Sequence, residues 1–442
     1  MAPKVSIIIP SLNTAPYIPQ CLESAVAQTL SEIEIICVDA GSTDGTFEIL
    51  EDFAKKDNRI KLLHSKRKSY GYQVNMGLKT AKGNYIAILE ADDFVDTDMY
   101  EQLFQIAEEN NADFVRSYYY DHIEKKDYLH NYMENIKVNT LLSGNEIWDM
   151  TKLKCIWAAI YRRDFLISDE IYFNETPGAS YQDSAFAFKV AICAKRAYLS
   201  DKAFYHYRND NPNSSVHSKE KVYCVCDEVK EAQNFVEKRF PGQKGIYELL
   251  ASFRFQTYLW NYRRLPLEHR RDFLEIMNYE LLNDWNSGYL NKNSFKPHYW
   301  SILVDIIFKK EQFFWKTTIP ETGILNIKLY GRAITDELSK YDNIIIYGAG
   351  TYGKHLLAFL RSLGTNDEKI AFAVSADYES MIDNIPCHCI RNWVHLSDSS
   401  LVIIAVEGLA QQEMFETAYE LGFKNILILD DIFKTLIKAV NT

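Results

Sequence analysis

The sequence predicts an α/β protein with a doubly wound, mostly parallel sheet, then a helical section and a smaller second sheet. Short apolar segments alternate with amphipathic helical segments through the first 120 residues, as in strand–helix–strand units. Another strand, a glycine-rich turn and a helix begin near residue 343. We therefore expect three parts, namely 1–218, a mainly helical 219–340, and a Rossmann-like 341–442.

Composition excludes several classes of protein. The chain is 47% hydrophobic and 25% charged, which is ordinary for a soluble globular protein. Its net charge of −11 argues against nucleic acid as the main partner, because nucleic-acid binders usually carry a basic face. No apolar run is long enough for a transmembrane helix, and the run near the N-terminus is too short for a signal peptide. Eight cysteines without zinc-site spacing favour free thiols in a reducing cytoplasm.

The N-terminal strands end in polar residues. The predicted strands are Val5–Ile9, Ile33–Val38, Ile60–Leu63 and Tyr85–Leu89, and the helix Tyr72–Ala81 is expected to be closed by Gly83. Pro10, Asp39 and the segment Glu90–Asp93 follow three of these strands. Ligands of such sheets bind outside the carboxyl ends of the strands, so one crevice should collect these residues.

Three carboxylates, Glu90, Asp92 and Asp93, stand at the end of the apolar strand Tyr85–Leu89. Burying them unpaired would be costly, so a cation should lie beside them. Carboxylate oxygens suit Mg²⁺ or Mn²⁺, and such sites usually take further ligands from water and phosphate. The functional interpretation is a metal ion that carries a diphosphate. The alternative is a solvated acidic turn before a helix.

The first strand–helix turn, PSLNTAP, contains no glycine. Dinucleotide fingerprints and P-loops both need glycines for close approach of the backbone to phosphate, so this turn is neither. A nucleotide bound here would have to be held by side chains and a metal ion. Asp39 could accept a hydrogen bond from a pyrimidine imide, or it could cap the next helix.

Three segments in order, VSIIIPSLN, VDAGSTDGT and NMGLKTAKGNYIAILEADD, resemble the family 2 glycosyltransferases, which have the GT-A fold. The resemblance covers about the first 120 residues. It implies a UDP-sugar donor, with Asp39 contacting the uracil and the later carboxylates binding metal and ribose or diphosphate. The implied donor-binding residues are Pro10, Asn13, Asp39, Asn75 and Asp92.

The chain departs from the family pattern at two positions. Glu90 replaces the usual Asp, so the metal contacts are assigned to Asp92 and Asp93, with Glu90 and His206 as further candidates. Val74 replaces an Arg that often contacts the diphosphate, and the basic residues at 66–68 are candidates for that contact.

The resemblance extends to a general base. Gln182-Asp183 matches the family's (E/Q)-D motif, so Asp183 is expected to take the acceptor's proton. Alternatively, Asp183 only caps the start of the helix, where the helix dipole stabilises its carboxylate. Residues 204–216 resemble the segment that closes over the donor, and His206 could contact phosphate or metal there, or simply pack.

The resemblance therefore implies an inverting, Mn²⁺- or Mg²⁺-dependent hexosyl- or N-acetylhexosaminyltransferase. It would move a sugar from a UDP-sugar to a hydroxyl of a glycan or lipid-linked glycan, as in capsule or lipopolysaccharide biosynthesis. The expected location is the cytoplasm, with peripheral contact at the inner face of the membrane and homo-oligomer formation as open alternatives.

The C-terminal part carries Gly348, Gly350 and Gly353 in a G-x-G-x-x-G turn between a strand and a helix. An acidic residue that binds ribose should end the second strand, but Ser375 stands there and Asp377 follows two residues later. We therefore expect a Rossmann-like domain without hydride chemistry. Two other functions stay open: an NAD-dependent sugar-modifying enzyme, and a non-catalytic scaffold that binds sugar nucleotides.

Overall fold

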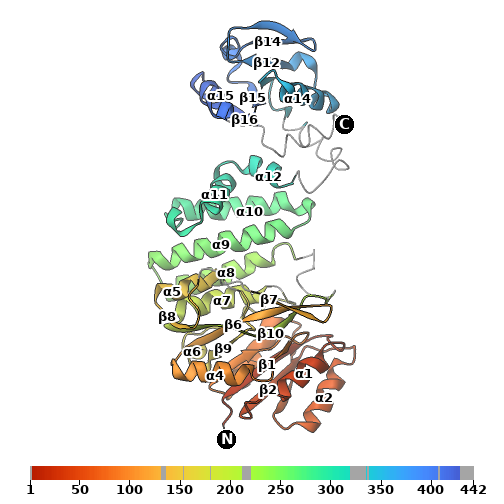
Figure 1. The fold of residues 1–442 in the computed structure, drawn as a ribbon, viewed down its shortest axis with the longest axis vertical. Helices are drawn as coiled ribbons and strands as arrows, with labels where there is room; N and C mark the ends of the chain where they lie inside the picture. Colours follow the sequence, from red (N-terminus) through yellow and green to blue (C-terminus); the bar gives the residue numbers. More distant parts are fainter. Residues whose placement is uncertain are drawn as a thin grey trace. The chain divides into compact units, whose positions relative to one another are not determined.

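Figure 1 shows the computed structural model of the chain, which describes residues 2–130, 136–152, 154–179, 181–211, 221–318, 335, 338–406 and 409–428. The chain divides into two compact units, Met1–Ile307 and Phe308–Thr442. The expected α/β class, with a large sheet, a helical middle section and a smaller second sheet, is confirmed. The finer division at residues 218 and 340 stays a prediction.

The first unit is built on a ten-stranded sheet with the order β3-β2-β1-β4-β9-β6-β10-β5, with β7 beside β6 and β8 beside β10. The pairs from β3 to β4 and the pair β6–β10 are parallel, while β9 and β5 run antiparallel to their neighbours. The strands are β1 Val5–Ser11, β2 Ile33–Asp39, β3 Ile60–His64, β4 Tyr85–Ile88, β5 Phe94–Val95, β6 Phe114–Ile123, β7 Lys126–His130, β8 Thr140–Ser143, β9 Ala159–Arg162 and β10 Arg196–Arg208.

Both faces of the central strands are buried, which explains why these strands read as nearly continuous apolar runs. Ile7 and Ile9 of β1 face one core with helices α1 (Ile18–Val26), α2 (Thr46–Lys56) and α4 (Met99–Glu109). Ile8 faces the other core with α3 (Tyr70–Thr80) and α7 (Gln182–Cys193). The alternation of side chains along each strand thus divides one sheet between two hydrophobic layers.

The predicted helix near residues 72–81 forms, but its ends differ from the prediction. Helix α3 begins at Tyr70, where Ser69 accepts a hydrogen bond from the amide of Tyr72, and its C-cap is Ala81. The expectation that Gly83 closes this helix is therefore wrong. Gly83 is instead needed for packing, since a Cβ there would lie 2.6 Å from the amide nitrogen of Ser6.

The rest of the first unit is helical. Helices α8, α9 and α10 pack in succession as layered rods (Figure 1). The helices after α4 are α5 Asn145–Trp148, α6 Arg163–Ser168, α7, α8 Cys224–Arg239, α9 Lys244–Arg264, α10 Leu267–Asn286 and α11 Pro297–Phe308. In the part of the chain that the structure describes, no helix is both long and apolar enough to cross a membrane.

The second unit contains a six-stranded sheet with the order β13-β14-β12-β11-β15-β16. All of its pairs are parallel except β13–β14. Its elements are α12 Lys310–Thr318, β11 Asn343–Tyr347, α14 Thr351–Ser362, β12 Ile370–Val374, β13 Glu379–Ile382, β14 Ile385–Cys389, β15 Ser400–Ile404, α15 Leu409–Glu420 and β16 Asn425–Ile428. Strand β11 followed by a turn and α14 is the strand–turn–helix unit expected from the glycines.

Candidate active site

A cleft of about 780 Å³ opens where β1 and β4 end. Its walls come from the β1–α1 turn, the loop after β2, the residues after β4, the start of α7 and the end of β10. Pro10, Asn13, Glu90, Asp92 and Asp183 are among the lining residues. Five side chains that the sequence singled out therefore share one cleft, at the edge of the sheet where the topology predicts a ligand.

Glu90 and Asp92 form the acidic wall. The Tyr70 hydroxyl donates a 2.6 Å hydrogen bond to Glu90 Oε1, and the Asn211 amide donates one of 2.7 Å to Asp92 Oδ2. Burial raises the pKa of Glu90 to about 8; the Tyr70 hydrogen bond opposes this rise, and the charges of Asp92 and Asp183 add to it. Converging carboxylates of this kind favour uptake of a cation or a proton.

Asp93 is turned away from this wall. Its side chain is buried, and its two oxygens accept 2.7 Å hydrogen bonds from the Tyr205 hydroxyl and the Arg208 amide. Burial, and then the charge of Asp92, raise the pKa of Asp93. Asp93 thus ties β10 to the segment after β4, while Asp92 reaches the cleft.

Arg208 at the end of β10 braces the segment after β4. Its Nε donates a 2.7 Å hydrogen bond to the carbonyl oxygen of Asp92, and another nitrogen donates one of 2.6 Å to Gln20. Its guanidinium carbon lies 5.1 Å from the centre of the Tyr17 ring. In the sequence, the segment FYHYR was a candidate because of His206, and Arg208 lies two residues later in the same segment.

On the opposite side of the cleft, Asp39 supports a loop. The amides of Gly41 and Ser42 donate to its Oδ2 at 2.8 and 3.0 Å, and the Ser42 hydroxyl donates to Oδ1 at 2.5 Å. Asp39 is only 1% exposed. Asn13 links the loop to the β1–α1 turn, because its amide donates to Ser42 Oγ and its side-chain oxygen accepts from the Thr43 amide, both at 2.9 Å. Asn13 and Thr43 line the cleft, and Asp39 lies behind them.

Asn75 is buried at a junction outside the cleft lining. Its side-chain amide donates to the carbonyl oxygen of Phe173, and its oxygen accepts from the Phe173 amide, both at 2.9 Å. Of the basic residues 66–68 that the sequence offered for the diphosphate, Arg67 forms a 3.1 Å ion pair with Glu175. These contacts hold α3 against the segment that precedes α7.

Asp183 lies in the first turn of α7, after Tyr181 in a left-handed conformation with φ 66°. The neighbouring Gln182 is buried and donates to Thr176 Oγ1 at 2.9 Å and to the Gly178 carbonyl oxygen at 3.0 Å, which anchors the turn. Burial raises the pKa of Asp183, and the charge of Lys154 opposes the rise. Burial also lowers the pKa of Lys154 to about 8. A carboxylate with a raised pKa suits proton transfer near neutral pH.

Aromatic side chains complete the cleft, and the sequence did not single them out. The rings of Trp157 and Tyr207 stack with centroids 5.1 Å apart and planes 6° apart, and both residues line the cleft with Tyr181. These rings give the cleft flat apolar walls, and the tyrosines add a polar edge. Trp157 lies in CIWAAIYRRDFL, a segment noted only for its likeness to an acceptor-side strand.

His206 is separate from the other candidates. Tyr207 lines the cleft, and side chains alternate along a strand, so His206 faces the other side of β10. Its ring nitrogens lie 3.1 Å from Asp96 Oδ1 and 3.0 Å from Asp127 Oδ1. The structure therefore does not bring His206 to the acidic wall.

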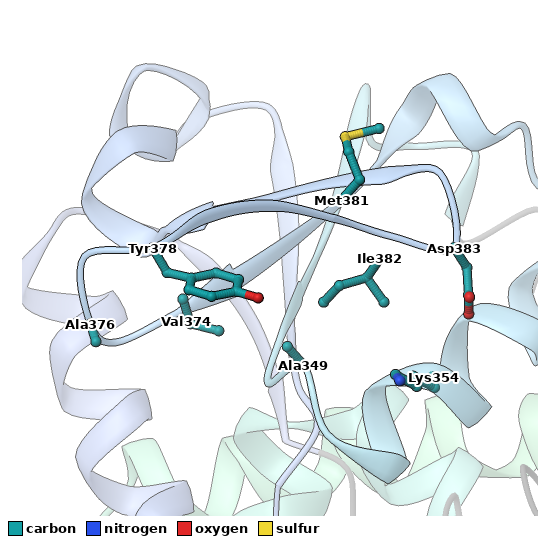
Figure 2. A pocket seen from close by; sticks show the side chains of 8 residues that line it. All are labelled: Ala349, Lys354, Val374, Ala376, Tyr378, Met381, Ile382 and Asp383. Atoms are coloured by element: carbon teal, nitrogen blue, oxygen red, sulfur yellow. The ribbon is translucent and has the colours of Figure 1, made fainter.

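The second unit has its own pocket of about 580 Å³ beside the glycine-rich turn (Figure 2). Ala349 and Lys354 line it from the turn and α14, and Tyr378, Met381 and Ile382 line it from β13 and the residue before it. Gly348 has φ 123°, and a Cβ on Gly353 would collide with the Gly348 carbonyl oxygen. The first and third glycines thus serve the backbone turn and the close packing of helix and strand.

Comparisons with known proteins match the N-terminal part of the chain to glycosyltransferases. The family described as Glycosyl transferase family 2 matches residues 6–168. Glycosyltransferase GlyG of Streptococcus pneumoniae is 30% identical over 217 residues, which cover 47% of this chain and 71% of GlyG. EpsJ of Bacillus subtilis, an uncharacterized glycosyltransferase, is 34% identical over 222 residues, which cover 48% of this chain and 63% of EpsJ.

A solved structure shares the fold. The structure of TarS residues 1–349 from S. aureus, in complex with UDP-GlcNAc, has a TM-score of 0.53 and 18% identity, and the match covers 70% of this chain and 89% of that one. The fold is therefore of the GT-A type. The chain belongs to glycosyl transferase family 2, as its sequence predicted.

Proposed function

We propose that the protein transfers a sugar from a UDP-sugar to a hydroxyl of a glycan or lipid-linked glycan, with inversion at the anomeric carbon. The observation that carries the proposal is the cleft itself, which is lined both by the acidic residues after β4 and by Asp183 on α7. A donor held by one group and an acceptor activated by the other would meet inside it. The TarS structure with UDP-GlcNAc supports a nucleotide-sugar donor for this fold.

The nucleotide half of the donor would lie against the turns after β1 and β2. Pro10, Asn13 and Thr43 line that side, and Asp39 orders the loop that carries Thr43. Asp39 would select uracil by accepting its imide N–H, and Asn75 would act on the donor by holding α3 in place.

Asp92 is the residue best placed to hold Mn²⁺ or Mg²⁺, and Glu90 would be its neighbour in the site. The fit rests on the donor set: both side chains are carboxylates that line the cleft, and burial, with the charge of Asp92 added to it, raises the pKa of Glu90. A divalent cation would favour the ionised form of both carboxylates. When bound, the ion would neutralise the charge of the departing diphosphate. Asp93 would keep Asp92 in position through Tyr205 and Arg208.

Asp183 would act as general base. The acceptor hydroxyl oxygen would attack the anomeric carbon from the face opposite the diphosphate, the bond from that carbon to the diphosphate oxygen would break, and Asp183 would take the hydroxyl proton. Burial raises the pKa of Asp183, and the charge of Lys154 opposes that rise and so favours the unprotonated carboxylate that the step needs. Trp157 and Tyr207 would present flat surfaces to the sugar rings.

UDP release tests the proposal directly. The full chain is incubated with Mn²⁺, a panel of UDP-hexoses and UDP-N-acetylhexosamines, and glycan or lipid-linked glycan acceptors. We expect acceptor-dependent release of UDP with at least one donor, and a product with inverted anomeric configuration by NMR. A retained configuration would refute the role of Asp183, and the absence of turnover with every UDP-sugar, alongside turnover with another nucleotide sugar, would refute the role of Asp39.

A further inference from the structure

A second group of metal-ligand side chains lies on the face of β10 opposite the cleft. It consists of His122 at the end of β6, Asp127 on β7 and His206 on β10. Asp127 Oδ1 lies 2.7 Å from His122 Nδ1 and 3.0 Å from His206 Nδ1, and the three ligand atoms all lie within 4.8 Å of one another. His122 and Asp127 are direct partners across the β6–β7 hairpin, so the sheet itself sets their spacing.

The hydrogen bonding of His206 leaves one nitrogen directed at this group. Its Nε2 lies 3.1 Å from Asp96 Oδ1, and the neutral tautomer with the proton on Nε2 donates to that carboxylate. Its Nδ1 then carries a lone pair that faces the oxygen of Asp127. Nδ1 is buried and contacts Asp127 Oδ1 at 3.0 Å, and His206 is only 7% exposed. In that tautomer two acceptor atoms lie 3.0 Å apart, so either a metal ion or a second ring proton must lie between them.

The surroundings hold the rings in the required orientation. The Phe94 ring stacks on His206 with centroids 4.4 Å apart and planes 7° apart, and its edge meets His122 at 5.0 Å. Asp96 adds the outer carboxylate that commonly orients a metal-binding histidine. Asp127 has a side chain that is 38% exposed, which gives an ion a route from solvent.

We propose that His122, Asp127 and His206 bind a divalent transition-metal ion such as Zn²⁺, separate from the ion proposed at Asp92. Two imidazoles and one carboxylate suit this class better than Mg²⁺, which prefers oxygen ligands. Ligands about 2.1 Å from Zn²⁺ in tetrahedral geometry lie about 3.4 Å apart, so the contacts of Asp127 with His122 and His206 need to open by about 0.7 and 0.4 Å. Water would complete the coordination.

The site would fasten the β6–β7 hairpin to β10. This connection matters because β10 also carries Tyr205 and Arg208, which hold Asp93 and Asp92. An ion at this site would therefore stabilise the acidic wall through β10, without contacting the donor. The competing occupant is a proton, with a doubly protonated His206 bonded to both Asp96 and Asp127.

Metal titration of the full chain separates the two occupants. After chelation and dialysis, Zn²⁺ is added and followed by calorimetry, and Co²⁺ by its visible absorption. We expect one tight equivalent in the wild type, and affinity reduced at least about 10-fold by His122→Ala or Asp127→Asn. His130→Ala is the matched control, because His130 lies on the same hairpin but pairs with Asp121. Asp92→Asn should also leave this equivalent intact.

X-ray absorption at the zinc edge of the loaded wild type covers the case in which a variant fails to fold. We expect scattering from two imidazoles and from oxygen. A thiolate shell, a shell of oxygen alone, Zn²⁺ binding that is equal in wild type and Asp127→Asn, or no Zn²⁺ binding by the wild type would each overturn the proposal. Since the readout is metal affinity, its failure would leave the transferase proposal untouched.

Discussion

The chain starts a parallel sheet twice, and the two strand–turn–helix units hold their pockets in different ways. After β1 the turn has no glycine, and its side chains, including Asn13, line the cleft. After β11 the turn depends on Gly348 and Gly353, whose missing side chains let the backbone fold tightly against the helix. Several carboxylates line the first pocket, whereas Asp383 and Lys354 are the charged residues that line the second. The comparison teaches that the first pocket offers a ligand the side chains of its turn and several carboxylates, whereas the second lies beside a tight backbone turn.

The largest expected effect concerns the ion at the first pocket. EDTA should abolish transfer, and Mn²⁺ should restore it. Asp92→Asn should weaken UDP-sugar binding in Mn²⁺ more than Asp93→Asn does, because only Asp92 lines the cleft. Asp93→Asn should instead lower the melting temperature. Calorimetry and thermal unfolding measure the two effects, and full activity in EDTA would refute the metal requirement.

Removal of the proposed general base, Asp183, should have the second-largest effect on transfer. Asp183→Asn keeps the shape of the side chain but cannot accept a proton, so transfer should fall by about 100-fold or more while UDP-sugar affinity stays near normal. Glu175→Gln is the control, since Glu175 is a carboxylate on the segment before α7 and pairs with Arg67. Normal turnover by Asp183→Asn, with loss in Glu175→Gln, would move the base to Glu175.

The uracil contact should have a smaller effect. Asp39→Ala should weaken UDP binding by about 1.5–3 kcal/mol, the range for a hydrogen bond to a charged group. Ser11→Ala is the control, because it removes only the 3.4 Å contact to Asp39. Calorimetry with UDP and CDP gives the comparison. Equal losses for both nucleotides would assign Asp39 to loop support alone.

The pH at which kcat/KM falls on the acid side should depend on Lys154. Burial raises the pKa of Asp183 and Lys154 opposes that rise, so kcat/KM should fall as pH drops through a pKa above the usual aspartate range. Lys154→Met removes the opposing charge and should move this limb to higher pH. Profiles of both proteins over pH 4–8 measure the shift, and a limb that stays in place would show that Asp183 does not set it.

The smallest expected effect is at the second pocket. NAD, NADH and NADPH titrated against the full chain should show no submicromolar binding, because Ser375 bonds to Tyr347 at 2.9 Å where an acidic ribose ligand would stand. A nicotinamide fluorescence change at submicromolar concentration, lost in a Gly350→Val variant, would instead support an NAD-dependent sugar-modifying enzyme.

The sequence predicted the fold class and the family, since both depend on local patterns. Apolar runs marked the buried strands, and strand ends marked the cleft that Asp92 and Asp183 share. It did not predict Arg208 or Trp157, because their roles arise from contacts between segments far apart in the chain. It also could not tell that Asp93 is buried, since the direction of a side chain after a strand depends on its partner, Tyr205.

One buried amide has a consequence for how a donor would arrive. Gln73 on α3 donates hydrogen bonds to the carbonyl oxygens of Ser11 and Val38, at 2.9 and 2.6 Å, where β1 and β2 end. Gln73 therefore joins the two turns that follow these strands, in addition to the contacts of Asn13. They cannot separate without leaving buried polar groups unpaired. We expect the nucleotide to associate in a single kinetic phase, with no slow opening of these turns before it binds.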